Sequence, residues 1–168
     1  MFKLFSKLII YFILFIFVLI APSFSETIKK IEIEGNNRIS SETIKMFSRV
    51  SLDDDIELYQ TNEILKRLYD TYYFKNISIK FENNILSIFV KENPIIQDIS
   101  YDGIKSSEIK KKVTDNLKLR SRSSYNEILL KDDKEKILLT LKNLGYYMPT
   151  VEVYVETLDD NKVDIKYI

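Results

Sequence analysis

Hydrophobic and polar residues alternate in three short stretches between residues 28 and 90, and a period of two is typical of half-buried β-strands. In the first stretch, Ile31 and Ile33 alternate with glutamates. The other two stretches flank Asn83-Asn84, a dipeptide typical of a hairpin turn. Between the first and second stretches, apolar residues recur with helical spacing in two segments. The pattern therefore predicts the order β-α-α-β-β.

Both helices of this first unit have recognisable starts. Ser40 can cap the first helix, which runs to about Ser48, and an acid in its first turn suits the helix dipole. The second helix is expected from near Thr61, after a polar loop, and it has one apolar face. That face comprises Ile64, Leu65, Leu68, Tyr69 and Tyr72. Two such helices can cover one face of a small sheet.

The same order of elements repeats after Pro94. Ile99 and Tyr101 mark a strand, and a helix starts at Ser107. A second helix is expected from Asp132, which precedes a glutamate by three residues as in a capping box. The closing strands carry Val151, Val153 and Val155 before the turn Asp159-Asp160-Asn161, and Val163, Ile165 and Tyr167 after it. The second unit is therefore also β-α-α-β-β.

The repeat predicts an α+β fold with two small domains in tandem, residues 26–93 and residues 94–168. Each domain is expected to have a three-stranded mixed sheet with two helices on one face. The apolar residues of the alternating stretches should then point into the core. This expectation covers Ile77, Ile79, Phe81, Val151, Val153 and Val155, and the aromatic residues Tyr72, Tyr73, Phe74, Tyr146 and Tyr147 should close the core where helix meets sheet.

Residues 1–25 have the pattern of a secretory signal peptide. Lys3 and Lys7 precede a continuous apolar run from Leu8 to Ala21, and Ser23-Phe24-Ser25 places small residues before a cleavage site. The run is shorter than the roughly 20 residues that usually span a bilayer. An uncleaved membrane anchor is the alternative. In both cases the remaining chain is expected outside the cytoplasm.

The composition argues against several classes of function. The 168 residues include 25 basic and 25 acidic ones, and no basic stretch stands out, so a nucleic-acid partner is not expected. Cysteine and histidine are both absent, which excludes disulfides, thiol nucleophiles, imidazole bases and Cys/His zinc sites. Asp53-Asp54-Asp55 lacks the spacing of a calcium loop, and we interpret it as a solvated loop. No serine-hydrolase motif is present. We therefore expect no enzyme activity, no catalytic or metal-binding residue and no cofactor.

Three stretches carry a resemblance to a known family. They are IEIEGNNRISSET from Ile31, LYDTYYFKNISI from Leu68 and FVKENPIIQDISYDG from Phe89, and LGYYMPTV from Leu144 supports the second unit. Their order and spacing resemble POTRA domains, the periplasmic modules of BamA-type outer-membrane assembly proteins. The chain departs from the family at Tyr72, where a glycine is frequent. The resemblance therefore covers only the N-terminal periplasmic arm of such proteins, and we expect these residues to contain no part of the membrane β-barrel.

The resemblance implies that the middle strand of each unit lies at a sheet edge, here residues 75–81 and 149–156. An open edge can bind an extended polypeptide through backbone hydrogen bonds. The expected partners are unfolded outer-membrane proteins and accessory assembly lipoproteins, and the expected location is the periplasm. The backbone positions expected to bind are Asn76, Ile77, Ser78, Ile79, Lys80, Val151, Glu152, Val153, Tyr154 and Val155.

Two other functions fit parts of the pattern. The periplasmic arm of a two-partner-secretion transporter also resembles two POTRA units. An FtsQ-type inner-membrane division protein would have an uncleaved anchor and one such unit, so the repeat argues against it. The expected function is therefore a periplasmic scaffold that binds other polypeptides.

Overall fold

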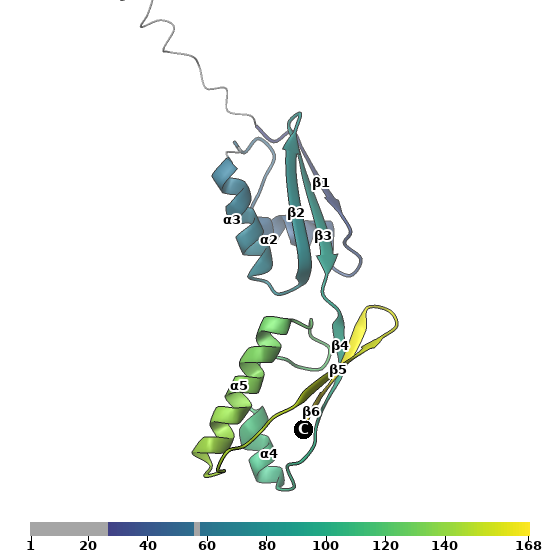
Figure 1. The fold of residues 1–168 in the computed structure, drawn as a ribbon. Coiled ribbons are helices and arrows are strands. Elements are labelled where there is room, and N and C mark those ends of the chain that lie inside the picture. The colour runs from purple at the N-terminus through teal and green to yellow at the C-terminus, as the bar shows by residue number, and fades with distance from the viewer. Residues whose placement is uncertain (1–26, 56–57) are drawn as a thin grey trace, which may run out of the picture.

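The computed structural model describes residues 27–55 and 58–168 (Figure 1). The proposed signal segment, residues 1–25, lies outside the described residues. The described chain forms two α+β units, one after the other, and in each unit two helices lie on one face of a three-stranded mixed sheet. The α+β fold predicted from the repeat is confirmed. None of the helices in the described ranges has the length and hydrophobicity needed to span a membrane.

The two sheets have the same topology. In the first, β3 lies in the centre, parallel to β1 and antiparallel to β2. In the second, β6 lies in the centre, parallel to β4 and antiparallel to β5. The elements of the first unit are β1 (Lys30–Glu34), α2 (Ser41–Ser48), α3 (Leu58–Tyr69), β2 (Phe74–Glu82) and β3 (Ile85–Glu92). Those of the second are β4 (Ile95–Tyr101), α4 (Ser107–Thr114), α5 (Glu127–Asn143), β5 (Val153–Leu158) and β6 (Lys162–Tyr167).

Local signals explain two of the predicted helix starts and both predicted hairpin turns. The Ser40 hydroxyl accepts a hydrogen bond from the Thr43 N–H at 3.2 Å, as expected of an N-cap. Ser106 does the same for α4, which begins at the predicted residue, Ser107. The predicted hairpin turns are also confirmed, because both central residues of each turn have positive φ, as in type I′ turns. They are Asn83 (51°), Asn84 (64°), Asp160 (58°) and Asn161 (54°).

The start of α5 differs from the prediction. The helix begins at Glu127, and its N-cap is Asn126, whose side chain accepts a hydrogen bond from the Ile128 N–H at 2.9 Å. The predicted start at Asp132 is wrong, since this residue lies inside the helix. The neighbouring Asp133 is buried on the same helix face as Ile137, where it interrupts the apolar pattern that would have revealed the first turns.

Each unit has its own hydrophobic core. The first core contains Ile28, Ile44, Ile64, Leu68, Phe74, Leu86, Ile88 and Val90. The second contains Ile96, Val113, Leu117, Leu119, Ile137, Leu141, Val151, Val163, Ile165 and Tyr167. We place the boundary between the units at Asn93 and Pro94, between the end of β3 and the start of β4.

Side chains and backbone also join the two units. The Arg38 guanidinium of the first unit donates to the Ser124 hydroxyl of the second at 2.8 Å. Its other side meets the carboxylate of Glu92, 3.4 Å from Arg38 Nε to Oε2. The side-chain amide of Asn161 in the second unit donates to the backbone carbonyl of Glu92 in the first at 3.5 Å. One arginine therefore bridges the end of β3 and the second unit.

The turn after α3 carries a tyrosine in a conformation that favours glycine. Tyr72 has a φ of 59°, and its counterpart in the second unit, Gly145, has a φ of 91°. A non-glycine residue in the left-handed region costs about 1–2 kcal/mol. We expect Tyr72→Gly to raise the free energy of unfolding by about 1 kcal/mol, measured by urea denaturation.

The matched control for this prediction is Gly145→Ala, which should lower the free energy of unfolding by about 1 kcal/mol. Tyr72 is 39% exposed, so its removal leaves no large cavity. A less stable Tyr72→Gly variant would show instead that packing of the Tyr72 ring outweighs the backbone strain.

Candidate binding site at the open sheet edges

The predicted binding residues of the first unit lie together on an edge strand. Asn76 to Lys80 belong to β2, which pairs with β3 on one side and with no described strand on the other. A register shift between Phe74 and Asn76 bends the start of the strand. The inward side chains Ile77 and Ile79 are half-buried against the first core, as expected.

The second edge strand is displaced from its predicted range. Strand β5 spans Val153–Leu158, whereas the expected strand was 149–156. Val151 and Glu152 precede it, and Val151 is buried in the core. Glu152 still exchanges two backbone hydrogen bonds with Ile168, at 2.9 and 3.0 Å. Among the predicted residues of this unit, β5 itself therefore carries Val153, Tyr154 and Val155.

Val155 is not a core residue, which corrects the expectation from alternation. Its side chain is 37% exposed, although it points to the same side of β5 as the partly buried Val153. Val155 is exposed because the helices do not cover this part of the strand. The β5–β6 hairpin projects beyond the helix pair in Figure 1, so the helices cover only the start of β5. In the first unit, α3 packs directly along β2.

A tyrosine of α3 occupies one backbone donor of β2. The Tyr69 hydroxyl accepts a hydrogen bond from the Ile77 N–H at 3.1 Å, across eight residues of sequence. No described side chain accepts a hydrogen bond from a backbone N–H of β5 in this way. A strand added to β2 must therefore displace the Tyr69 hydroxyl from the Ile77 N–H. A strand added to β5 displaces no described side chain from a backbone N–H.

The aromatic residues after α3 and α5 behave differently. Phe74 is buried in the first core, as expected. Tyr73 stacks on Phe47 with ring centroids 5.8 Å apart, but Tyr72 and Tyr73 are 39% and 38% exposed and do not belong to this core. In the second unit, Tyr146 is 47% exposed and Tyr147 is 92% exposed. The expectation that these two tyrosines close the core is wrong, because the segment after α5 runs along the surface.

A cleft of about 580 Å³ lies between the two units. The first unit contributes the end of α3 and the start of β2, and the second contributes the start of α5 and one face of the β5–β6 hairpin. Its lining includes Tyr69, Phe74, Lys75, Asn76, Tyr125, Glu127, Ile128, Val155 and Thr157. Parts of both predicted edge strands therefore meet at one cleft.

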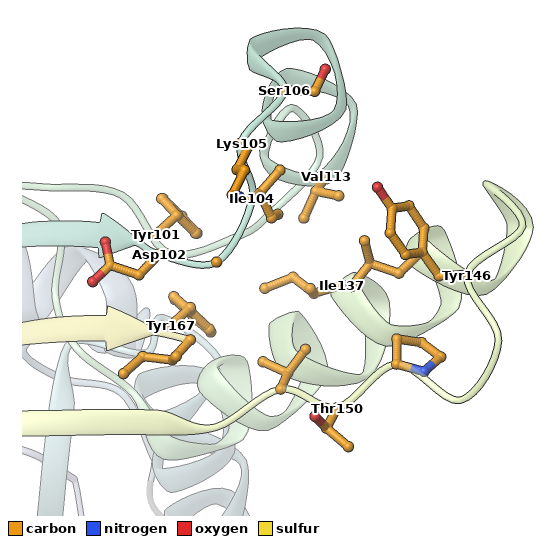
Figure 2. Close-up of a pocket in the computed structure, with 15 residues that line it drawn as sticks. Tyr101, Asp102, Ile104, Lys105, Ser106, Val113, Ile137, Tyr146, Thr150 and Tyr167 are labelled. Carbon is orange, nitrogen blue, oxygen red and sulfur yellow. The ribbon is translucent and has the colours of Figure 1, made fainter.

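A second hollow, of about 480 Å³, opens at the end of the second unit that faces away from the first (Figure 2). Val113 of α4, Ile137 of α5 and Tyr146 surround it, and Tyr167 of β6 lies at its floor. Among the predicted binding residues, Val151 is the one that lines this hollow. It is the open end of the second core, and it lies apart from the β5 edge.

Two buried carboxylates were missed by the sequence analysis. Glu92 is 6% exposed, and its Oε1 accepts hydrogen bonds from the backbone N–H groups of Asn37, Arg38 and Ile39, at 2.9, 3.0 and 2.9 Å. Asp133 is 1% exposed and accepts from two consecutive backbone N–H groups. A single acid within an apolar pattern is usually a solvent-facing residue, so the sequence offers no signal for this role.

Asp133 also affects a buried phenol. Its Oδ1 and Oδ2 accept from the N–H groups of Lys118 and Leu119, at 2.7 and 2.8 Å. Burial, and then the charge of Asp133, hold the pKa of Tyr167 well above its usual value. Tyr167 therefore stays neutral. Within the described ranges no group of acidic side chains is placed to hold a metal ion.

Comparison with known proteins agrees with this geometry. The POTRA family model, described as a surface antigen variable number repeat, matches residues 94–168. These residues are thus similar to POTRA domains. The first unit has the same strand order and connections as the unit that matches this family.

A curated relative covers both units. The chain is 26% identical over 157 residues to the outer membrane protein assembly factor BamA of Neorickettsia risticii (strain Illinois). The match covers 85% of this chain and 19% of the relative, so the chain spans about a fifth of that protein. The resemblance to the POTRA domains of BamA-type proteins is thus confirmed.

Solved structures share the fold. The N-terminal domain of Omp85 from Thermosynechococcus elongatus has a TM-score of 0.57 at 14% identity, over 83% of this chain and 61% of that one. POTRA1-2 of Omp85 from Anabaena has a TM-score of 0.53 at 12% identity, over 83% of this chain and 92% of that one. The described chain therefore shares its fold with a solved pair of POTRA units.

Proposed function

We propose that this chain is the periplasmic POTRA scaffold of an outer-membrane β-barrel assembly protein. The BamA relative and the POTRA match support the class of function. The partners would be unfolded outer-membrane proteins and accessory assembly lipoproteins, and the location would be the periplasm. The chain would bind polypeptides and would catalyse no reaction.

The observation that carries the binding mechanism is the position of β2 and β5. Each is paired on one side only within the described chain, so each exposes a row of backbone N–H and C=O groups. An extended client can add to such an edge through main-chain hydrogen bonds, which tolerate different client sequences. Alternating side chains of the client would then contact the two faces of the sheet.

An NMR titration tests this proposal. The ¹⁵N-labelled protein is mixed with a peptide taken from one strand of an outer-membrane barrel. We expect amide shifts in residues 74–82 and 153–158, because these backbone groups would gain hydrogen-bond partners. Shifts confined to the helices, with unchanged amides in both edge strands, would refute the proposal.

Tyr69→Phe separates the two edges. Removing the hydroxyl frees the Ile77 N–H, and one net hydrogen bond contributes about 0.5–1.5 kcal/mol. We expect peptide affinity at β2 to rise about threefold to tenfold, with affinity at β5 unchanged. Tyr154→Phe is the control, since the Tyr154 hydroxyl bonds the Glu152 carboxylate rather than an edge amide. Equal affinity of Tyr69→Phe and wild type at β2 would show that Tyr69 does not compete with the peptide.

A further inference from the structure

The outer face of β5 is acidic. Glu156 of β5 pairs with Asp164 of β6, and both line one surface hollow together with Asp98 of β4. Asp164 accepts a hydrogen bond from the Asp98 N–H at 2.9 Å. In the described part of the chain, none of these three carboxylates forms a salt bridge. Lys166 of β6 lines the same hollow, but its ammonium pairs with Asp102 at 2.7 Å, and Lys162 pairs with Asp160 at 3.5 Å.

The inner face of the same strand is apolar and open. Val155 and Thr157 line the cleft between the units, opposite Tyr69 and Phe74. Ile128, in the first turn of α5, lines the same cleft and is 64% exposed. A strand added to β5 would place every second side chain beside Val155 and Ile128 of this cleft and the others beside the carboxylates of the outer face.

The β2 edge offers the opposite charge and a partly occupied backbone. Lys75 and Lys80 lie on β2, and Lys91 lies on the neighbouring strand opposite Asn76. Glu82 offsets Lys80 through a 2.9 Å salt bridge, so this edge keeps a positive excess. Tyr69 also occupies the Ile77 N–H. A strand rich in lysine or arginine is therefore disfavoured at β2.

We propose that β5 is the edge that receives extended segments in which apolar residues alternate with lysine or arginine. The proposal rests on the proposed function and adds the chemical class of its client. Opposite charges on facing positions of paired strands are attractive, and like charges are destabilising. The two faces of β5 thus specify the two faces of the incoming strand.

Three synthetic peptides of equal length test the proposal. All have valine at alternate positions, and the positions between are lysine, glutamate or serine. With the ¹⁵N-labelled protein, we expect the valine–lysine peptide to shift residues 153–158 with an affinity about tenfold higher than the valine–glutamate peptide, since each charge pair contributes a few tenths of a kcal/mol to about 1 kcal/mol. The valine–serine peptide should lie between them. The preference should weaken in 0.5 M NaCl because salt screens exposed charges at the ~3–10 Å scale.

Two variants assign the preference to β5. Glu156→Lys should abolish the preference for the lysine peptide, whereas Glu135→Lys, an equal charge change on the exposed side of α5, should preserve it. Ile128→Ser should weaken all three peptides about equally, because it removes apolar surface from the cleft. The circular dichroism of each variant checks that it is folded.

The outcomes separate this proposal from the proposed function. Equal binding of all three peptides at β5 would overturn the charge and apolar specificity but leave binding at the edges intact. If no peptide shifted the amide signals of β2 or β5, the proposed function would be overturned as well. A concentration-dependent dimer in sedimentation, with β5 amides shifting on dilution, would assign the edge to a second copy and overturn the proposal.

Discussion

Replacing Gly35 by alanine should unfold the first unit while the second stays folded. Gly35 has a φ of 83°, and an added Cβ would lie 2.1 Å from the carbonyl oxygen of Val90 in β3. This oxygen belongs to the central strand and cannot move aside without breaking the sheet. Backbone strain of about 1–2 kcal/mol adds to this clash, so we expect a loss of 4 kcal/mol or more, roughly the upper range of single substitutions.

The matched control is Gly103→Ala at the equivalent turn of the second unit. Gly103 has nearly the same φ, 82°, but an added Cβ would meet no atom within 4 Å. The free energy of unfolding of this variant should fall only by the cost of backbone strain, about 1–2 kcal/mol. Amide hydrogen exchange measures both units separately, and Gly35→Ala should expose β1, β2 and β3 while β4, β5 and β6 remain protected. Equal losses in the two variants would show that the contact with Val90 is not what requires glycine.

Local patterns predicted most of the fold because they act over a few residues. The cap at Ser40 and the hairpin turn at Asn83-Asn84 depend on neighbours in sequence, and both are confirmed. The prediction for the start of α5 was wrong because it also relied on a local pattern. Asp132 has capping spacing, but Asn126 caps the helix, and the buried Asp133 hides the helical period between them.

The proposed binding surface was less predictable from the sequence than the fold. Alternation along a strand tells which residues share a face, but it does not tell whether a helix covers that face. Val155 therefore points to the inter-unit cleft although its spacing matches buried Val151. The hydrogen bond from Ile77 to Tyr69 depends on how α3 lies on β2, which no local pattern encodes.

The second large effect is expected at Glu92, which organises the loop before α2. Its carboxylate is almost fully buried and holds three consecutive backbone N–H groups and the Arg38 guanidinium. Removing the charge of such a buried network costs about 3–5 kcal/mol, because Arg38 loses its counter-ion and the three N–H groups keep only a neutral amide oxygen, a weaker acceptor than a carboxylate. We expect Glu92→Gln to lower the melting temperature by roughly 10 °C or more, measured by circular dichroism. Arg38 would also lose its anchor between the units.

The pH dependence distinguishes this role from simple packing. Burial acts to raise the pKa of Glu92, but the N–H groups of Ile39, Asn37 and Arg38 and the Arg38 side chain outweigh it, so the pKa lies below its usual value. A lowered pKa stabilises the fold above the unfolded-state pKa of about 4.3, and this contribution is lost as pH falls through the folded-state pKa. The difference between wild type and Glu92→Gln should therefore be constant near neutral pH and shrink below pH of about 4.

The control for this titration is an exposed acid with a pKa lowered in the same direction. The pKa of Glu108 is lowered by its hydrogen bond and charge interaction with Lys112, one helical turn away. Because that pair is exposed to solvent, Glu108→Gln should leave the melting temperature nearly unchanged at every pH. If the difference in melting temperature between wild type and Glu92→Gln were the same at low and neutral pH, the packing of the Glu92 side chain and not its charge would stabilise the loop. A gap that closes on acidification would show that the ionised carboxylate fixes the loop before α2 and, through Arg38, the link between the units.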